Sequence, residues 1–303
     1  MRRERTNDSL RPDRLRGEMR QILSQVVREV DVVIARPRAT PASLHRLHRE
    51  MRQLRTALAI WEELLGPAGQ IQLRPLSARI RRLTRLVGQV RDRDVTLGLL
   101  AGVADHVHPE EEQEQLRQYR SRLEDDARTG RELLRAFLRS ERQAHLFDQV
   151  GEAFNLRTRS LPSGEIDRVL AEHQRESREK VMTAHRKARR RPSMQRLHRL
   201  RIRVRRLRQM SELASSLKER DNASSAGSLR RLQQHLGRLH DLDVLVHDLN
   251  PTLRRTSWAE ILHQERRRQR KAITKALKAR KPSRLSGDLP APRAVPPGRP
   301  TSP

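Results

Sequence analysis

Two stripes of side chains run side by side along residues 194–209, which read MQRLHRLRIRVRRLRQ. At about 100° per residue of an α-helix, steps of three and four residues return to the same face. The apolar stripe consists of Leu197, Leu200, Val204 and Leu207. The neighbouring stripe, which is rich in nitrogen, consists of His198, Arg201, Arg205 and Arg208. The pattern predicts a helix that buries one face and presents the next to an anion, although a solvated basic face fits a single helix equally well.

The same two stripes occur 153 residues earlier in the chain. The apolar positions there are Leu44, Leu47, Met51 and Leu54, and the nitrogen-rich positions are His45, His48, Arg52 and Arg55. On the far side of the helix the repeats differ, because Glu50 and Gln53 stand where the later segment has Arg203 and Arg206. Arginines that serve only solubility give no reason for one face to agree better than another. The agreement therefore favours a duplicated anion-binding face, with Glu50 and Gln53 expected on the outer side.

A second pair of segments supports the duplication. Residues 83–95 align with residues 232–244 at an offset of 149, and Gly88 then matches Gly237. Glycine inside a helix costs about 1 kcal/mol relative to alanine, so we expect both glycines to allow another helix to approach closely. Basic side chains precede both, at Arg81, Arg82, Arg85, Arg230 and Arg231. Four acids follow, Asp92, Asp94, Asp241 and Asp243, which we expect to orient arginines by bidentate hydrogen bonds.

Hydrophobic periodicity predicts an all-α protein, since no window alternates at period two. Only 2% of the residues are aromatic, so the core must be built mainly from Leu, Val, Ile and Ala. The expected helices cover residues 11–35, 42–65, 71–107, 110–151 with a break near Gly130, 165–190, 193–218, 225–250 and 251–280. Proline at position 251 suits the first turn of the last of these helices.

Three segments lack this periodicity and divide the chain. Residues 1–10 are expected to be a disordered N-terminus, residues 156–164 a linker, and residues 282–303 a disordered tail rich in proline. The helical part, residues 11–281, then consists of two halves, 11–155 and 165–281, with about four long helices in each.

A formal net charge of +29 implies a polyanionic partner. Nucleic acid, an anionic membrane and inorganic polyphosphate all have this property. The absence of cysteine excludes disulfides, thiolate chemistry and Cys-type zinc sites. No apolar run approaches the ~18 residues of a membrane span, and residues 1–10 are polar. We therefore expect a soluble, cytoplasmic protein.

The two pairs of motifs resemble the signature of the CHAD family, named for a conserved histidine α-helical domain. Its first motif, roughly His-x-x-Arg-x-x-x-Arg-Arg-x-Arg, is filled by His198, Arg201, Arg205, Arg206 and Arg208, while His48 and Gln53 replace arginines in the first half. Its second motif, Leu-Gly-x-x-Arg-Asp-x-Asp-Val, resembles residues 87–95 and, with His240 in place of the arginine, residues 236–244. The resemblance implies two four-helix bundles related by a pseudo-twofold axis, with a basic central surface or pore that binds inorganic polyphosphate. It also implies an association with polyphosphate granules.

The combined prediction is a non-enzymatic polyphosphate-binding protein that needs no cofactor and no metal. The expected contacts are His45, His48, Arg49, Arg52, Arg55, Arg81, Arg82, Arg85, His198, Arg201, Arg205, Arg206, Arg208, Arg230 and Arg231. Arginine suits this ligand because its planar fork of donors meets phosphate oxygens two at a time. Neighbouring arginines oppose protonation of the histidines, and bound phosphate favours it. The affinity for polyphosphate is therefore expected to rise on mild acidification.

Three alternatives stay open at this point. The basic runs Arg266–Lys271 and Lys187–Arg191 would attract nucleic acid non-specifically at low salt. The dipeptide His240-Asp241 superficially resembles the HD-type metal phosphohydrolases, although Arg91-Asp92 stands at the equivalent place and arginine is no metal ligand. A membrane-surface role is weaker, because the basic helices lack a Trp or Phe edge. The sequence leaves the oligomeric state open.

Overall fold

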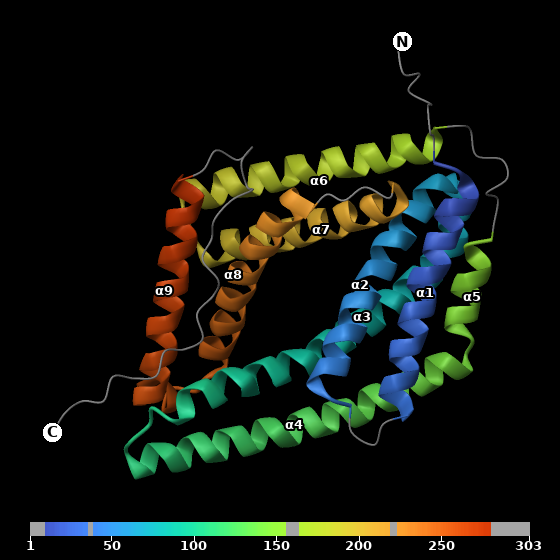
Figure 1. Cartoon of the computed structure of the whole chain (residues 1–303). Coiled ribbons are helices and arrows are strands. Elements are labelled where there is room, and N and C mark those ends of the chain that lie inside the picture. The colour runs from blue at the N-terminus through green and yellow to red at the C-terminus, as the bar shows by residue number, and fades with distance from the viewer. Residues whose placement is uncertain (1–9, 36–38, 156–163, 219–222, 280–303) are drawn as a thin grey trace. The chain divides into compact units, whose positions relative to one another are not determined.

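The computed structural model describes residues 10–35, 39–155, 164–218 and 223–279 (Figure 1). Every regular element in these residues is helical, which confirms the all-α prediction for this part of the chain. The segment around Pro37, the linker 156–163 and the tail 280–303 lie outside the described residues. Of the first ten residues only Leu10 is described. It is buried, and its amide donates to the Asp167 carboxylate over 2.8 Å.

The described helices follow the predicted order closely. They are α1 (Pro12–Ala35), α2 (Pro41–Leu64), α3 (Gly66–Ala104), α4 (Glu110–Gln143), α5 (Leu146–Ala153), α6 (Glu165–Arg190), α7 (Met194–Lys218), α8 (Ala223–Asp248), the 3-10 helix η2 (Leu253–Arg255) and α9 (Ser257–Ala279). α2 begins earlier than expected because Thr40 caps it, with its Oγ1 accepting the amide of Ser43 over 3.2 Å. Pro41 is then tolerated in the first turn, where an amide needs no intrahelical partner.

Two predicted helix boundaries are wrong. Gly130 lies inside α4, and the chain breaks instead at His145, whose φ of 51° is left-handed and ends the helical path before α5. Pro251 does not start the last helix, because η2 follows it and α9 begins only at Ser257. Thr256 caps α9, since its Oγ1 accepts the amide of Ala259 over 3.3 Å.

The chain forms two compact units that differ from the two consecutive halves expected from the sequence. Among the described residues, unit 1 contains 10–35, 39–89, 131–155, 164–177 and 209–218, and unit 2 contains 90–130, 178–208 and 223–279. The divisions fall inside α3, α4, α6 and α7, so each unit takes helices from both sides of residue 156.

In unit 1, α1 and α2 lie side by side (Figure 1). The apolar stripe of α2 is fully buried there, as predicted, at Leu44, Leu47, Met51 and Leu54. Glu50 corrects the prediction of an outer face, because it is buried too and pairs with Arg49, with Nη2 and Oε1 2.6 Å apart. α2 is therefore covered on a wider face than its apolar stripe.

In unit 2, α8 packs beside α9 and joins two apolar clusters (Figure 1). Leu242 and Leu245 of α8 pack with the second part of α3 and with Trp258 of α9. Leu236 and Leu239 of α8 pack with the apolar stripe of α7. α8 therefore packs against α3 with one part of its length and against α7 with the other.

Candidate anion-binding site

α7 places the two stripes of residues 194–209 as its periodicity requires. The apolar stripe is buried in the core of unit 2, at Leu197, Leu200, Val204 and Leu207. The nitrogen-rich stripe beside it is half-buried, at His198, Arg201, Arg205 and Arg208. Arg199 and Arg206 are exposed. The helix therefore separates its basic residues into a set held near the core and a set in water.

α8 and α3 bring further charged groups to the half-buried stripe. Leu239 and Leu242 are buried on either side of His240 and Asp241, so these two polar side chains project from the edge of the core. On α3, Val90 is buried directly before Arg91 and Asp92. The charges of Arg91 and Asp92 act on Arg201 and Arg205, so these α3 residues lie close to α7.

We call this group the α3–α7–α8 cluster. Its members are Arg91, Asp92, His198, Arg201, Arg205, Arg238, His240 and Asp241, and all of them belong to unit 2. Four guanidinium groups face two carboxylates. The cluster thus carries an excess of positive charge even when both histidines are neutral.

The two histidines of the cluster form a pair. The Nδ1 atoms of His198 and His240 lie 3.3 Å apart, and their ring centroids are 4.8 Å apart at 45°. One Nδ1 must donate and the other accept, so at least one ring of the bonded pair is neutral. Desolvation lowers the pKa of His240 to about 4, and the charges of Arg201, His198, Arg205 and Arg91 add to this shift. Desolvation, Arg201 and Arg205 also lower the pKa of His198, while Asp243 opposes them.

The acids of the cluster lie among its arginines and offset part of their positive charge. Desolvation raises the pKa of Asp241, and the positive charges of Arg91, Arg201 and Arg238 oppose that rise. Asp92 accepts from Arg91 over 3.2 Å. Desolvation raises the pKa of Asp92, and the positive charges of three arginines oppose that rise. Water limits the desolvation, because 59% of the Asp92 side chain is exposed. The carboxylates therefore weaken the repulsion between neighbouring guanidinium groups.

Arg201 carries a buried donor that is open to an anion. Its Nε is buried and has no hydrogen-bond partner among the described residues. Burial lowers the pKa of both Arg201 and Arg205, yet a guanidinium stays protonated in proteins. A buried donor without a partner costs about 1–3 kcal/mol, so an incoming anion that accepts from this atom would recover part of that cost.

At the edge of the cluster, Asp243 binds Arg266 of α9. The Arg266 Nε donates to Asp243 Oδ1 over 2.6 Å, and the Asp243 side chain is largely buried. Asp243 thus pairs with an arginine of the run Arg266–Lys271, which the sequence links to nucleic acid. Asp94 is half-buried on α3.

The predicted contacts of the first half lie in unit 1. His48 and Arg52 are half-buried on α2, while His45 and Arg55 are exposed. Arg81, Arg82 and Arg85 are exposed on α3, and the Arg82 guanidinium stacks 4.8 Å from the ring centroid of Phe137. Arg49 is bonded to Glu50.

The two aligned glycines have different surroundings. A Cβ on Gly88 would lie 3.3 Å from Nε2 of His48, so this glycine does allow a close approach, by a side chain of α2. A Cβ on Gly237 would meet no atom of the described residues within 4 Å. The prediction of a close approach is therefore wrong at Gly237. Nearby, Arg230 is exposed and Arg231 is half-buried on α8.

Three members of the cluster are not among the contacts expected from the sequence. Arg91, Arg238 and His240 all lie in the second pair of aligned segments. The signal was the alignment of Arg91 with His240, because it placed a nitrogen-rich side chain at the same point of both repeats.

The same surroundings bear on the metal-hydrolase alternative. Desolvation and the charges of three arginines lower the pKa of His240. The same positive charges oppose the binding of a divalent cation beside His240 and Asp241. Within the described ranges, no three His, Cys, Asp or Glu side chains are grouped to hold a metal ion. In that part of the chain no helix is both long and apolar enough to cross a membrane.

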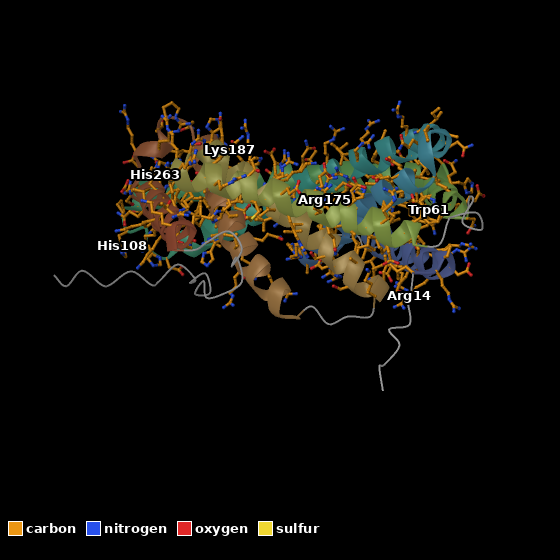
Figure 2. The ribbon with its side chains drawn as sticks, turned by 90° about the horizontal axis from the view of Figure 1, so that it is seen from above. Arg14, Trp61, His108, Arg175, Lys187 and His263 are labelled. Carbon is orange, nitrogen blue, oxygen red and sulfur yellow. The ribbon has the colours of Figure 1, made fainter. Side chains whose placement is uncertain are left out.

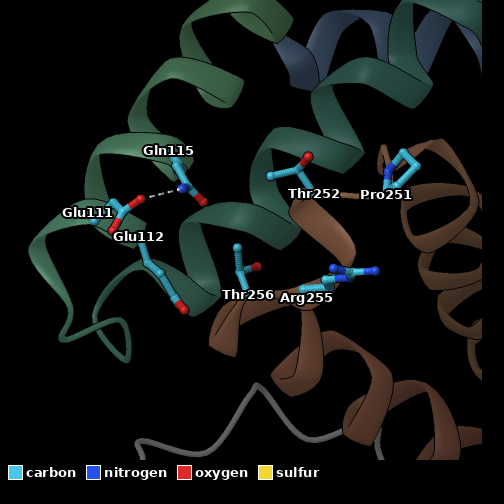
Figure 3. A pocket seen from close by; sticks show the side chains of 7 residues that line it. All are labelled: Glu111, Glu112, Gln115, Pro251, Thr252, Arg255 and Thr256. Carbon is cyan, nitrogen blue, oxygen red and sulfur yellow. Dashed lines mark hydrogen bonds between the residues drawn. The ribbon is translucent and has the colours of Figure 1, made fainter.

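A separate pocket of about 410 Å³ lies in unit 2 between the start of α4 and the connection from α8 to α9 (Figure 3). Its lining includes Glu111, Glu112, Arg255 and Thr256. Glu112 accepts the amide of Ser257 over 2.8 Å, and Thr256 caps α9. These polar groups thus serve the start of α9, and the pocket holds no member of the α3–α7–α8 cluster.

Comparison with known proteins places this fold in a family. The chain is similar to the crystal structure of the CHAD domain from the plant Ricinus communis, with a TM-score of 0.66 and 20% identity over 90% of this chain and 93% of that one. It is also similar to PptA from Streptomyces chartreusis, with a TM-score of 0.61 and 13% identity over 89% and 99% of the two chains. At identities this low, the structural likeness shows a shared fold alone. No curated protein sequence matches the chain significantly. The CHAD-domain family model matches residues 17–250, and the chain therefore belongs to the CHAD-domain family.

Proposed function

We propose that this protein binds inorganic polyphosphate at the α3–α7–α8 cluster and catalyses no reaction on it. The observation that carries the proposal is the half-buried group of arginines around Arg201, whose buried Nε has no hydrogen-bond partner among the described residues. CHAD domains are associated with polyphosphate binding. A linear polyanion also rewards closely spaced cations, because each neutralised phosphate releases counterions.

The proposal extends to a duplicated domain over residues 11–281. The basic residues of unit 1 repeat the motif of α7 at His45, His48, Arg52 and Arg55. In this proposal they supply a second set of phosphate contacts, which an Arg52→Ala variant would weaken. The protein would act in the cytoplasm, at polyphosphate granules.

Non-specific nucleic-acid binding is the rival use of the same charge. Competition separates the two readings. A long DNA duplex is titrated into a complex with labelled inorganic polyphosphate at about 0.15 M salt, where weak phosphate contacts are screened. Retention of polyphosphate supports the proposal. Efficient displacement by DNA at that salt would show that the cluster is a general polyanion surface.

A further inference from the structure

A second concentration of positive charge lies on α9, on the side turned away from the core of unit 2. The buried side chains of this helix are Trp258, Ala259, Leu262, Glu265, Gln269, Ile273 and Leu277. At about 100° per residue, a basic stripe lies roughly 150° around the helix from their centre. That stripe consists of Arg267, Arg270, Lys271, Lys275 and Lys278, and all five are exposed.

These side chains border a shallow groove of about 750 Å³, together with Thr274. From Arg267 to Lys278 the helix rises about 16 Å, at 1.5 Å per residue. Arg267 is bonded to Glu260, which lies about two turns before it on α9. No acidic residue follows Glu265 in α9, so the rest of the groove carries lysine and arginine alone as charged residues.

A second basic segment adjoins the groove. Arg270 Nη2 donates to the carbonyl oxygen of Pro192 over 2.6 Å, so α9 touches the connection between α6 and α7. Exposed cations gather directly before Pro192, at Lys187, Arg189, Arg190 and Arg191. The sequence has no acid from Lys180 to Ser211. Figure 2 labels Lys187 in this part of unit 2, where nitrogen-tipped side chains project from the ribbon.

We propose that this surface, the α9 groove with the end of α6, binds the phosphate backbone of a nucleic-acid duplex without regard to base sequence. Its length corresponds to about five base pairs at 3.4 Å per pair. Exposed lysines and arginines with mobile heads suit contacts to phosphates on a solvated duplex. The surface is broad and exposed, whereas the α3–α7–α8 cluster is compact and half-buried. This inference stands independently of polyphosphate binding.

Other polyanionic surfaces fit the groove less well. A membrane-surface helix needs large apolar side chains beside its basic ones. The exposed large apolar residues in the described part of the chain are Ile71, Leu133 and Met194, and none of them is on α9. The apolar face of α9 is already buried, at Ile273 and Leu277. The six aromatic residues of the chain are also too few for a base-stacking platform, so recognition through the backbone is the mode that remains.

The test uses the full chain, a fluorescent 30-base-pair DNA duplex and inorganic polyphosphate as separate probes. Lys271→Glu/Lys275→Glu reverses two charges in the groove. Arg74→Glu/Arg122→Glu makes the same change in net charge at exposed positions of α3 and α4. Because all four positions are exposed, we expect circular-dichroism melts to match the wild type. Lys275→Glu/Lys278→Glu repeats the test if the first groove variant melts lower.

The groove variant is expected to raise the Kd for the duplex about tenfold or more and to reduce its salt dependence by roughly two phosphate contacts. The control variant should change that Kd less than threefold, and neither should change the Kd for polyphosphate more than threefold. An equal rise of the duplex Kd in both variants would overturn the inference, because only net charge would then matter. So would an equally large loss of polyphosphate binding, or loss of binding to phosphatidylserine vesicles with duplex binding unchanged. Absence of polyphosphate binding in the wild type would contradict the proposed function alone, and the duplex titration would still decide the role of the groove.

Discussion

His198 of α7 and His240 of α8 face each other with their Nδ1 atoms 3.3 Å apart, inside a group of arginines. Desolvation and the arginines hold the pKa of His240 at about 4 and lower that of His198, so both rings are neutral at pH 7 in the free protein. A bound phosphate chain would favour the charged rings and raise both pKa values. Binding then takes up protons wherever the pH lies between the free and bound pKa values.

Affinity for long-chain polyphosphate is therefore expected to rise as the pH falls from about 7.5 to 5.5. A His198→Asn/His240→Asn variant should lose most of this dependence, because asparagine does not titrate. Isothermal titrations at both pH values in buffers of different ionisation enthalpy measure the affinity and the proton uptake together. A wild-type isotherm that does not change with pH, or an equal pH dependence in the variant, would refute the role of the pair.

Asp241 is expected to limit the affinity for polyphosphate. Its carboxylate faces Arg91 and Arg201, but desolvation outweighs their attraction, because the pKa of Asp241 is raised. Asp241→Asn should therefore leave the unfolding free energy unchanged or raise it slightly. The variant also lacks one negative charge beside the bound phosphates, so the rise in Tm on adding polyphosphate should exceed that of the wild type. A ligand-induced rise no larger than the wild-type value, or a clear loss of stability without ligand, would contradict this role of the acid.

The two aligned glycines make a matched stability test. Gly237→Ala places a methyl group where no atom of the described part of the chain lies within 4 Å, and alanine favours the helix by up to about 1 kcal/mol. Gly88→Ala places the same group 3.3 Å from His48 Nε2, so that ring must shift. Thermal unfolding should show a gain for Gly237→Ala and a smaller gain or a loss for Gly88→Ala. Equal gains would mean that His48 yields freely.

His185 of α6 gives a second stability prediction. The residue is fully buried, and neither ring nitrogen has a hydrogen-bond partner among the described residues. Burial, with Arg189, lowers its pKa in the fold, while the unfolded chain takes up a proton near pH 6.5. Because the unfolded state takes up this proton more readily than the folded state, the free energy of unfolding decreases as the pH falls below about 6.5.

His185→Leu should raise the free energy of unfolding by about 1–2 kcal/mol, because no buried donor is left unpaired. It should also flatten the decline between pH 7 and 5. His235→Leu is the matched control, since His235 is buried but its Nδ1 lies 3.2 Å from Gln269 Oε1. Urea unfolding at both pH values should show a loss of stability for His235→Leu. A loss of similar size for His185→Leu would indicate that His185 has a polar role in the fold.

The sequence predicted the parts of this fold that depend on helical periodicity. Leu197, Leu200 and Val204 are buried beside a half-buried basic stripe because a 3.6-residue period determines both positions at once. The break at His145 could not be predicted, because a left-handed φ at a non-glycine residue leaves no mark in composition. Gly130 was the expected breaker, yet a single glycine weakens a helix without ending it.

The site was predictable in part, for the same reason. Periodicity identified the contribution of α7, but the approach of Arg91 and His240 depends on how α3 and α8 pack around a shared core. Glu50 shows the same limit. A carboxylate reads as a surface residue, and only the packing of α2 shows that it is buried against Arg49.

The proposed binding of polyphosphate depends most on the half-buried arginines of α7. Isothermal titration of inorganic polyphosphate at about 0.15 M salt into the wild type, Arg205→Ala and Arg199→Ala tests it most directly. Both variants remove one positive charge from the same helix, but Arg205 belongs to the α3–α7–α8 cluster and Arg199 is exposed. We predict that the Kd rises about tenfold or more for Arg205→Ala, equivalent to about 1.4 kcal/mol, and less than threefold for Arg199→Ala. Equal changes in the two variants, or no change in Arg205→Ala, would contradict the assignment of polyphosphate to this cluster.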